Sequence, residues 1–252
     1  MPLFLLEMKS SIAAPRSSLR DSVHVWVWDG GGVSIRKMED ALHISERAYA
    51  SRFRSAKARE TFLRGRFAVR TLLSHYLGQH RTSWIIATGR FGKPDVLMAD
   101  RSLYFNLSHD EHCIVVALSS VGDVGVDVEA EPDSGAVAII AEQHFSHLER
   151  EALNAGALTF SQIWTAKEAV LKASGDGITS WLKEVEVVCC IAGAIALAEH
   201  VHYRGKDYLL AQRQLMQRQV SVSAVLGRDE DVRKRAATFD THIEVFDYSN
   251  LI

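Results

Sequence analysis

The chain has 252 residues, 47% of them hydrophobic and 24% charged, which is the composition of a globular protein and not of a disordered or fibrous one. Its formal net charge of −2 gives no basic field for general binding to nucleic acid or membranes, so we expect neither as a partner. Three cysteines, Cys113, Cys189 and Cys190, fit neither a disulfide framework nor a zinc site, which indicates a reducing, cytoplasmic compartment.

No segment predicts export or a membrane span. The short apolar run near the N-terminus lacks the preceding basic region of a signal peptide. The longest uncharged apolar run, residues 187–198, is too short to cross a bilayer as a helix. We therefore expect a soluble chain.

The first half is expected to mix strands with one long helical region. After a loose segment over residues 1–20, residues 24–28 alternate as a strand does. Residues 45–77 repeat apolar side chains at three- and four-residue spacing, which predicts helix ending at Gly78. A strand over 83–89 and a turn over 89–94 follow, and further strands are expected at 104–109, 113–120 and 124–130.

The second half repeats this mixture. The sequence SHLE at 146–149 predicts a capping box with Ser146 as N-cap. Residues 159–175 form the clearest predicted helix, which ends at Gly175. Strands are expected at 185–188, 208–211 and 220–226. Strands and helices do not alternate strictly, so the prediction is an α+β fold with subdomains over 21–121 and 122–252.

Two acids interrupt the valine-rich strand VGVDVEA. Side chains two residues apart on a strand share a face, so Asp127 and Glu129 point to one side while Val126 and Val128 point to the other. Two neighbouring carboxylates suit Mg²⁺, which binds one or two of them together with waters and phosphates. A solvated acidic face on an edge strand is the alternative that this pair alone leaves open.

The predicted helix 159–175 carries a third acid. Trp164, Glu168 and Lys172 lie four residues apart and therefore line one side of this helix. Glu168 is a candidate third carboxylate and Lys172 a candidate phosphate partner. A solvated Glu-Lys pair on the surface explains the same spacing, and the spacing does not decide between these two interpretations.

A basic stretch precedes these motifs. Between positions 47 and 70 the chain has eight basic residues and one acid, Glu60; the bases are Arg47, Arg52, Arg54, Lys57, Arg59, Arg64, Arg66 and Arg70. Solvated helix faces usually mix both signs, so this stretch favours a phosphate-rich ligand. Lys93 adds a base in the glycine-flanked turn GRFGKP.

The adjacent Ser108 and His109 raise the question of a serine hydrolase. Neighbouring residues on a strand point to opposite faces, so this pair is not placed to form a hydrogen bond between a nucleophile and its base. We therefore expect both side chains to bind a ligand instead of forming a catalytic triad.

Four motifs in this order resemble those of a known family. They are GKP at 92–94, FNLSH at 105–109, VGVDVE at 124–129 and WTAKEAVLKASGDG at 164–177. Together they resemble the Sfp-type 4′-phosphopantetheinyl transferases of the holo-acyl-carrier-protein synthase superfamily. The resemblance implies two similar α+β subdomains with pseudo-twofold symmetry and a site between them.

The resemblance also implies a reaction and its partners. The 4′-phosphopantetheine arm of coenzyme A would pass to a serine of an apo acyl or peptidyl carrier protein, with Mg²⁺ as cofactor and 3′,5′-ADP as the leaving product. Carriers of fatty-acid, polyketide and nonribosomal peptide synthesis all match this description. Two subdomains in one chain make a monomer the simplest expectation.

Site residues follow from the resemblance, motif by motif. Asp127, Glu129 and Glu168 would bind Mg²⁺. Positions that bind coenzyme A would be Lys93, Pro94, Ser108, His109 and Lys172. Arg52 and Arg54, with Arg47 and Arg66 behind them, are expected to hold the 3′-phosphate, because Tyr49 stands where the family often has a base. Asp110 departs from the family pattern too, since a serine is frequent there.

Two catalytic roles are expected. Glu168 would take the proton of the carrier serine, directly or through a water on the metal ion, and Lys172 would stabilise the departing 3′,5′-ADP. Two other functions fit the same residues. One is a Mg²⁺-dependent hydrolase of coenzyme A or nucleotides, and the other is a non-catalytic module that binds coenzyme A or a carrier protein.

Overall fold

The computed structural model describes residues 19, 22–89, 91–97, 103–111, 113–120, 122–177, 182–191, 193–215, 220–228 and 242–248. The helices are α1 (Ile35–Ala41), α2 (Ile44–Ala50), α3 (Ala56–Leu77), α4 (Ser134–His144), α5 (His147–Asn154) and α6 (Phe160–Ser174), with short 3₁₀ turns at Arg81–Ser83 and Leu182–Glu184. The strands are β1 (Ser22–Trp28), β2 (Ile86–Thr88), β3 (Pro94–Val96), β4 (Tyr104–His109), β5 (Ile114–Ser119), β6 (Val124–Ala130), β7 (Val188–Ile191), β8 (Ala194–Leu197), β9 (His200–Tyr203), β10 (Lys206–Leu215), β11 (Val220–Arg228) and β12 (His242–Asp247).

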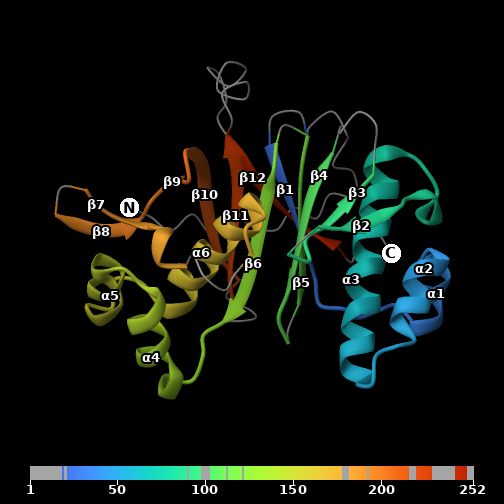
Figure 1. Ribbon diagram of the computed structural model, residues 1–252, viewed down its shortest axis with the longest axis horizontal. Helices are drawn as coiled ribbons and strands as arrows, with labels where there is room; N and C mark the ends of the chain where they lie inside the picture. Colours follow the sequence, from blue (N-terminus) through green and yellow to red (C-terminus); the bar gives the residue numbers. More distant parts are fainter. Residues whose placement is uncertain are drawn as a thin grey trace.

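Two four-stranded sheets form the centre of the molecule. One sheet has the order β12-β1-β5-β4 and the other has the order β6-β11-β10-β9. Figure 1 shows α3 on the outer face of the first sheet and α6 on the outer face of the second. Two separate hairpins, β2-β3 and β7-β8, lie beside these layers. The mixed α+β fold that the sequence predicts is therefore confirmed.

Strand β1 shows how alternation in the sequence builds these layers. Val23, Val25 and Val27 lie in an apolar cluster between the sheets, together with the valines of β6. Trp26 and Trp28 point to the other face and belong to the core beneath α3. Successive side chains on a strand point to opposite faces, so one short segment contributes to two cores.

The long helical region of the first half is interrupted. Helix α2 ends at Ala50 and α3 begins at Ala56, so the expectation of helix throughout 45–77 is wrong between the two. Ser55 is the N-cap of α3, and its side chain accepts a hydrogen bond from the amide of Ala58. A serine that satisfies a free helical amide favours a new helix start over continuation. Gly78, at φ 71°, ends α3 as expected.

The second half follows the prediction more closely. Ser146 and Glu149 form the predicted capping box of α5, and α6 ends at Gly175. The strand expected at 185–188 is displaced, since β7 spans Val188–Ile191. Within the described residues, no helix is long and apolar enough to cross a membrane. The segment 1–20 lies almost entirely outside the described residues.

Candidate active site

Strand β6 and helix α6 pack closely where the acidic motifs meet. A Cβ atom on Gly125 would lie 2.5 Å from the amide nitrogen of Ala173 and closer still to the carbonyl oxygen of Ala169. Only glycine permits this approach of the two backbones. The contact fixes the end of α6 that carries Glu168 and Lys172 against the strand that carries Asp127.

Asp127 is the centre of a buried polar cluster. Its side chain is almost fully enclosed, and its Oδ1 atom accepts hydrogen bonds from the Ser108 hydroxyl at 2.7 Å and from the Lys172 ammonium. Lys172 also donates to Ser108 Oγ at 2.9 Å. The other oxygen, Asp127 Oδ2, is buried and has no hydrogen-bond partner among the described atoms. Three predicted site residues therefore lie in one cluster that leaves a carboxylate oxygen unused.

Glu168 and Glu129 lie beside this cluster. Glu168 Oε2 is 3.7 Å from Lys172 Nζ, which makes the predicted pair along the helix. Burial and the negative charge of Asp127 raise the pKa of Glu168 to about 7. The same two causes raise the pKa of Glu129 to about 7. Three carboxylates are thus concentrated around one lysine, and their mutual repulsion disfavours the fully ionised site.

The oxygen atoms of this cluster have the chemistry that suits a divalent cation. Within the part of the chain that the structure describes, no group of three or more His, Cys, Asp or Glu side chains is placed to hold a metal ion. Mg²⁺, however, commonly takes one or two protein carboxylates and completes its shell with waters and substrate phosphates. The unused Asp127 Oδ2 is a suitable ligand, and a cation would relieve the repulsion that raises the pKa values of Glu129 and Glu168. An all-oxygen donor set favours Mg²⁺ over zinc.

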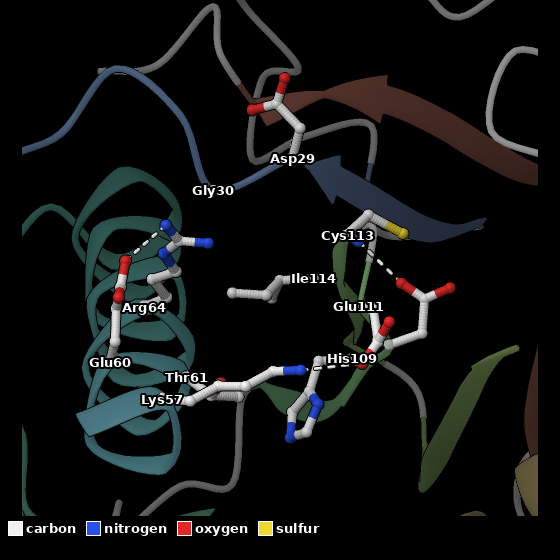
Figure 2. A pocket seen from close by; sticks show the side chains of 11 residues that line it. Asp29, Gly30, Lys57, Glu60, Thr61, Arg64, His109, Glu111, Cys113 and Ile114 are labelled. Carbon is white, nitrogen blue, oxygen red and sulfur yellow. Dashed lines mark hydrogen bonds and ion pairs between the residues drawn. The ribbon is translucent and has the colours of Figure 1, made fainter. Parts of the chain in front are cut away.

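Ser108 and His109 point in different directions, as their adjacency predicts. Ser108 is buried against Asp127, whereas His109 is exposed and lines a pocket of about 120 Å³. Figure 2 shows Lys57 and Arg64 extending from α3 into this pocket, with His109 on the opposite wall. The surrounding protein and the charge of Lys172 lower the pKa of His109.

Lys93 lies at a different position from His109. Its ammonium group donates to the carbonyl oxygens of Val124, at 3.3 Å, and Ala173, at 3.2 Å. Burial lowers its pKa. Lys93 lines a second pocket of about 210 Å³, next to Gly175, and Pro94 opens β3 directly after it. Through these two hydrogen bonds, Lys93 joins the first half of the chain to β6 and α6.

The basic stretch is only partly available to a ligand. Five of its members form ion pairs with acids: Lys57 with Glu111, Arg59 with Glu39, Arg64 with Glu60, and Arg66 and Arg70 with Glu46. Arg70 is fully buried and also donates to backbone oxygens of Arg81 and Trp84, which is a structural role. By contrast, Arg47, Arg52 and Arg54 are exposed around the break between α2 and α3. The expectation of one uniform positive face therefore applies only to these three.

Several residues of the site were missed by the sequence analysis. Asn106 is buried, and its side-chain oxygen accepts the amide of Val126 at 2.9 Å, which aligns β4 with β6. An asparagine inside an apolar strand was the available signal, because such a group is buried only when it is hydrogen-bonded. Lys57 and Thr61 share a pocket with His109 across more than forty residues of sequence, and no local pattern reveals that contact.

Known proteins are similar to this chain over the segment that contains β6 and α6. A family model described as the 4′-phosphopantetheinyl transferase superfamily matches residues 123–224, which include β6 and α6. The 4′-phosphopantetheinyl transferase HetI of Nostoc sp. is 32% identical over 178 residues, which are 67% of this chain and 75% of that protein. AcpT of Escherichia coli, which has the same activity in its name, is 36% identical over 122 residues, 46% of this chain and 58% of that protein.

The chain therefore belongs to the 4′-phosphopantetheinyl transferase superfamily. It is an enzyme that transfers the 4′-phosphopantetheine arm of coenzyme A to a carrier protein. The resemblance that the sequence motifs indicate is thereby confirmed.

Proposed function

We propose that this transfer depends on Mg²⁺ held by Asp127, Glu129 and Glu168. The observation that carries the proposal is the buried Asp127 Oδ2, which has no partner among the described atoms, beside two carboxyl groups with pKa values of about 7. When bound, Mg²⁺ would supply charge neutralisation for the pyrophosphate of coenzyme A.

Glu168 and Lys172 act on the reacting groups. The carrier serine oxygen forms a bond to the phosphorus that carries pantetheine, and the bond from that phosphorus to the bridging oxygen breaks. Glu168 accepts the serine proton, directly or through a water on the metal ion, since its carboxyl group lies beside Lys172 and Asp127 in the site. Lys172, held between Asp127 and Glu168, offsets the negative charge of the departing 3′,5′-ADP.

Other residues position the coenzyme. Ser108 fixes Lys172 and Asp127, and His109 lines the pocket that also contains Lys57 and Arg64. Arg52 and Arg54 stay our candidates for the 3′-phosphate, since both are exposed and lie next to the start of α3. For Lys93 and Pro94, the buried contacts of Lys93 favour a role in shaping the site from behind, through Val124 and Ala173.

We also propose that two pseudo-symmetric subdomains, 21–121 and 122–252, build the site as a monomer. The order β1-β5-β4 in the first sheet matches the order β6-β11-β10 in the second, and α3 corresponds to α6, which supports this proposal. Strand β12 is an exception to the boundary, because it comes from the second half of the chain and pairs with β1.

Mass spectrometry of apo carrier proteins tests the metal assignment. We expect a mass increase of one phosphopantetheine group with coenzyme A and Mg²⁺, and its loss when the metal is chelated. Asp127→Asn should lower kcat/KM by a factor of about a hundred or more, since removing one electrostatic group from a catalytic site has that effect. Equal rates with and without chelator would overturn the Mg²⁺ proposal while leaving the transferase activity intact.

An Asp127→Asn enzyme with unchanged kcat/KM and unchanged dependence on Mg²⁺ would be equally contradictory. Glu168→Gln separates the two roles of that residue, because near-normal transfer with normal metal affinity would exclude Glu168 as the base.

Release of 3′,5′-ADP from coenzyme A without any carrier measures the hydrolytic side reaction, and we expect it to be slow.

A further inference from the structure

Another acid, just past the end of β6, connects this strand with the start of α6. Glu131 follows the end of the strand, and its two carboxylate oxygens accept the backbone amides of Phe160 and Ser161, each at 3.1 Å. Ser161 Oγ also donates to this carboxylate, at 2.5 Å. Sequence analysis gave Glu131 no role, and the catalytic roles proposed above leave it unused.

These contacts complete the N-terminus of the helix. The first amides of an α-helix have no partner inside the helix. In α6, Glu131 accepts those of the first two residues, and the side chain of the N-cap Thr159 accepts that of Gln162. A carboxylate at this position is also favoured by the helix dipole. The start of α6 is therefore closed by a side chain that belongs to another element.

Helix α6 is attached to β6 at two separated points. Glu131 holds its first turn at the end of the strand, and Gly125 contacts Ala169 and Ala173 near the beginning of the strand. Asp127 and Glu129 lie between these points on the strand. The glycine contact lies next to Glu168 and fixes that residue on the helix. Glu129 is two residues from Glu131, and the pairing of β6 with β11 ends between them, at Ala130.

From this arrangement we infer that Glu131 is a positioning residue, which sets the separation between Glu129 on the strand and Glu168 on the helix. Without its carboxylate, the first turn of α6 would lose its attachment to the end of β6, and the separation between Glu129 and Glu168 would change. The inference rests on the proposed function, in which these carboxylates hold a divalent cation.

Metal binding without coenzyme A tests this inference. We would measure binding of Mn²⁺, a spectroscopic substitute for Mg²⁺, by electron paramagnetic resonance in the full-length enzyme, Glu131→Ala, Glu131→Gln and Asp133→Asn. Asp133 is the matched control, since it removes the same charge two residues away and makes no side-chain cap bond to α4. Outer residues that orient metal ligands typically change affinity by 10- to 100-fold, and we expect about tenfold weaker binding in Glu131→Ala.

Kinetic and exchange measurements complete the test. The Mg²⁺ concentration for half-maximal transfer should rise by the same factor of about ten in Glu131→Ala, with kcat restored at saturating Mg²⁺. The amides of Phe160 and Ser161 should exchange faster with solvent. Glu131→Gln keeps one acceptor oxygen, so its metal affinity should lie between those of the unsubstituted enzyme and Glu131→Ala. It also provides a folded variant if the alanine enzyme is unstable.

The outcomes separate this inference from the proposed function. Unchanged Mn²⁺ affinity in a folded Glu131→Ala or Glu131→Gln enzyme, with normal binding by the unsubstituted enzyme, would overturn the positioning role alone. A lower melting temperature with unchanged metal affinity would show that Glu131 is only structural. If the unsubstituted enzyme bound no Mn²⁺ and transferred normally with chelator, the metal site and the inference would both be wrong.

Discussion

At the scale of single residues, the site places one lysine among three carboxyl groups. Lys172 contacts Asp127 directly and lies 3.7 Å from Glu168, so it neutralises only part of the negative charge. Strand and helix periodicity place each pair on one face, and the resemblance to the transferase family then made these residues site candidates. The sequence did not reveal that Ser108 binds Asp127, since that contact joins two strands nineteen residues apart.

The surplus acidity predicts an unusual dependence of stability on pH. The folded pKa values of Glu129 and Glu168, about 7, exceed the ordinary value of 4.5, so the folded state binds more protons between these pH values. Without metal, the free energy of unfolding should therefore fall as pH rises from about 4.5 to about 7. One pKa unit corresponds to about 1.4 kcal/mol. Because Glu129 is only half-buried and screened by solvent, and because both glutamates interact with Asp127, we expect a combined loss of roughly 2–3 kcal/mol, well below the sum of two full shifts.

Denaturant unfolding in the presence of a chelator, over a series of pH values, measures this slope. The double variant Glu129→Gln/Glu168→Gln is the control, because glutamine does not titrate and should flatten the curve between pH 5 and 7. A wild-type curve as flat as that of the double variant would contradict the prediction. Added Mg²⁺ should stabilise the wild-type protein most at the upper end of this range.

At the scale of elements, helix α6 was predictable and the interruption before α3 was not. Thr159, Gly175 and the apolar spacing between them mark both ends and the buried face of α6. Residues 45–77 have the same spacing throughout, and the local hydrogen bond of Ser55 decides where the second helix begins. The tight contact of α6 with β6 depends on Gly125, whose importance becomes visible only when the two elements are placed together.

Gly125→Ala should disturb both stability and transfer. A Cβ atom would lie far inside the 3.4 Å at which ordinary contact begins, against backbone atoms of Ala169 and Ala173 that cannot turn aside. Helix α6 must then move away from β6, and we expect a loss of about 1–3 kcal/mol in the free energy of unfolding, with a large fall in kcat. Gly135→Ala in α4, where nothing lies within 4 Å, is the matched control and should be neutral or slightly stabilising. Equal effects of both substitutions on denaturant midpoints would disprove the packing argument.

At the scale of the whole molecule, the two halves are interdependent in ways that no local pattern shows. Strand β12 pairs with β1 in parallel, with Ser22 opposite His242, so chain segments from opposite ends of the sequence lie side by side (Figure 1). The valines of β1 and β6, with Val115 and Ala117 of β5, form one apolar cluster between the sheets. Local periodicity identified most of these strands individually, but their pairing depends on contacts across the entire chain.

Tyr248 tests this interdependence, because it follows β12 and packs in the core of the first half. It is 1% exposed, and its ring centre lies 5.1 Å from that of Trp28. Tyr248→Ala should lower the free energy of unfolding by about 3–5 kcal/mol, the usual cost of removing a large buried aromatic side chain. Tyr49→Ala, at a residue that is 53% exposed, is the control and should cost about 1 kcal/mol or less.

Because the sheets share a core, tryptophan fluorescence and circular dichroism should report one coincident transition for Tyr248→Ala. Two separate transitions, with only the first shifted by the substitution, would mean that the halves unfold independently.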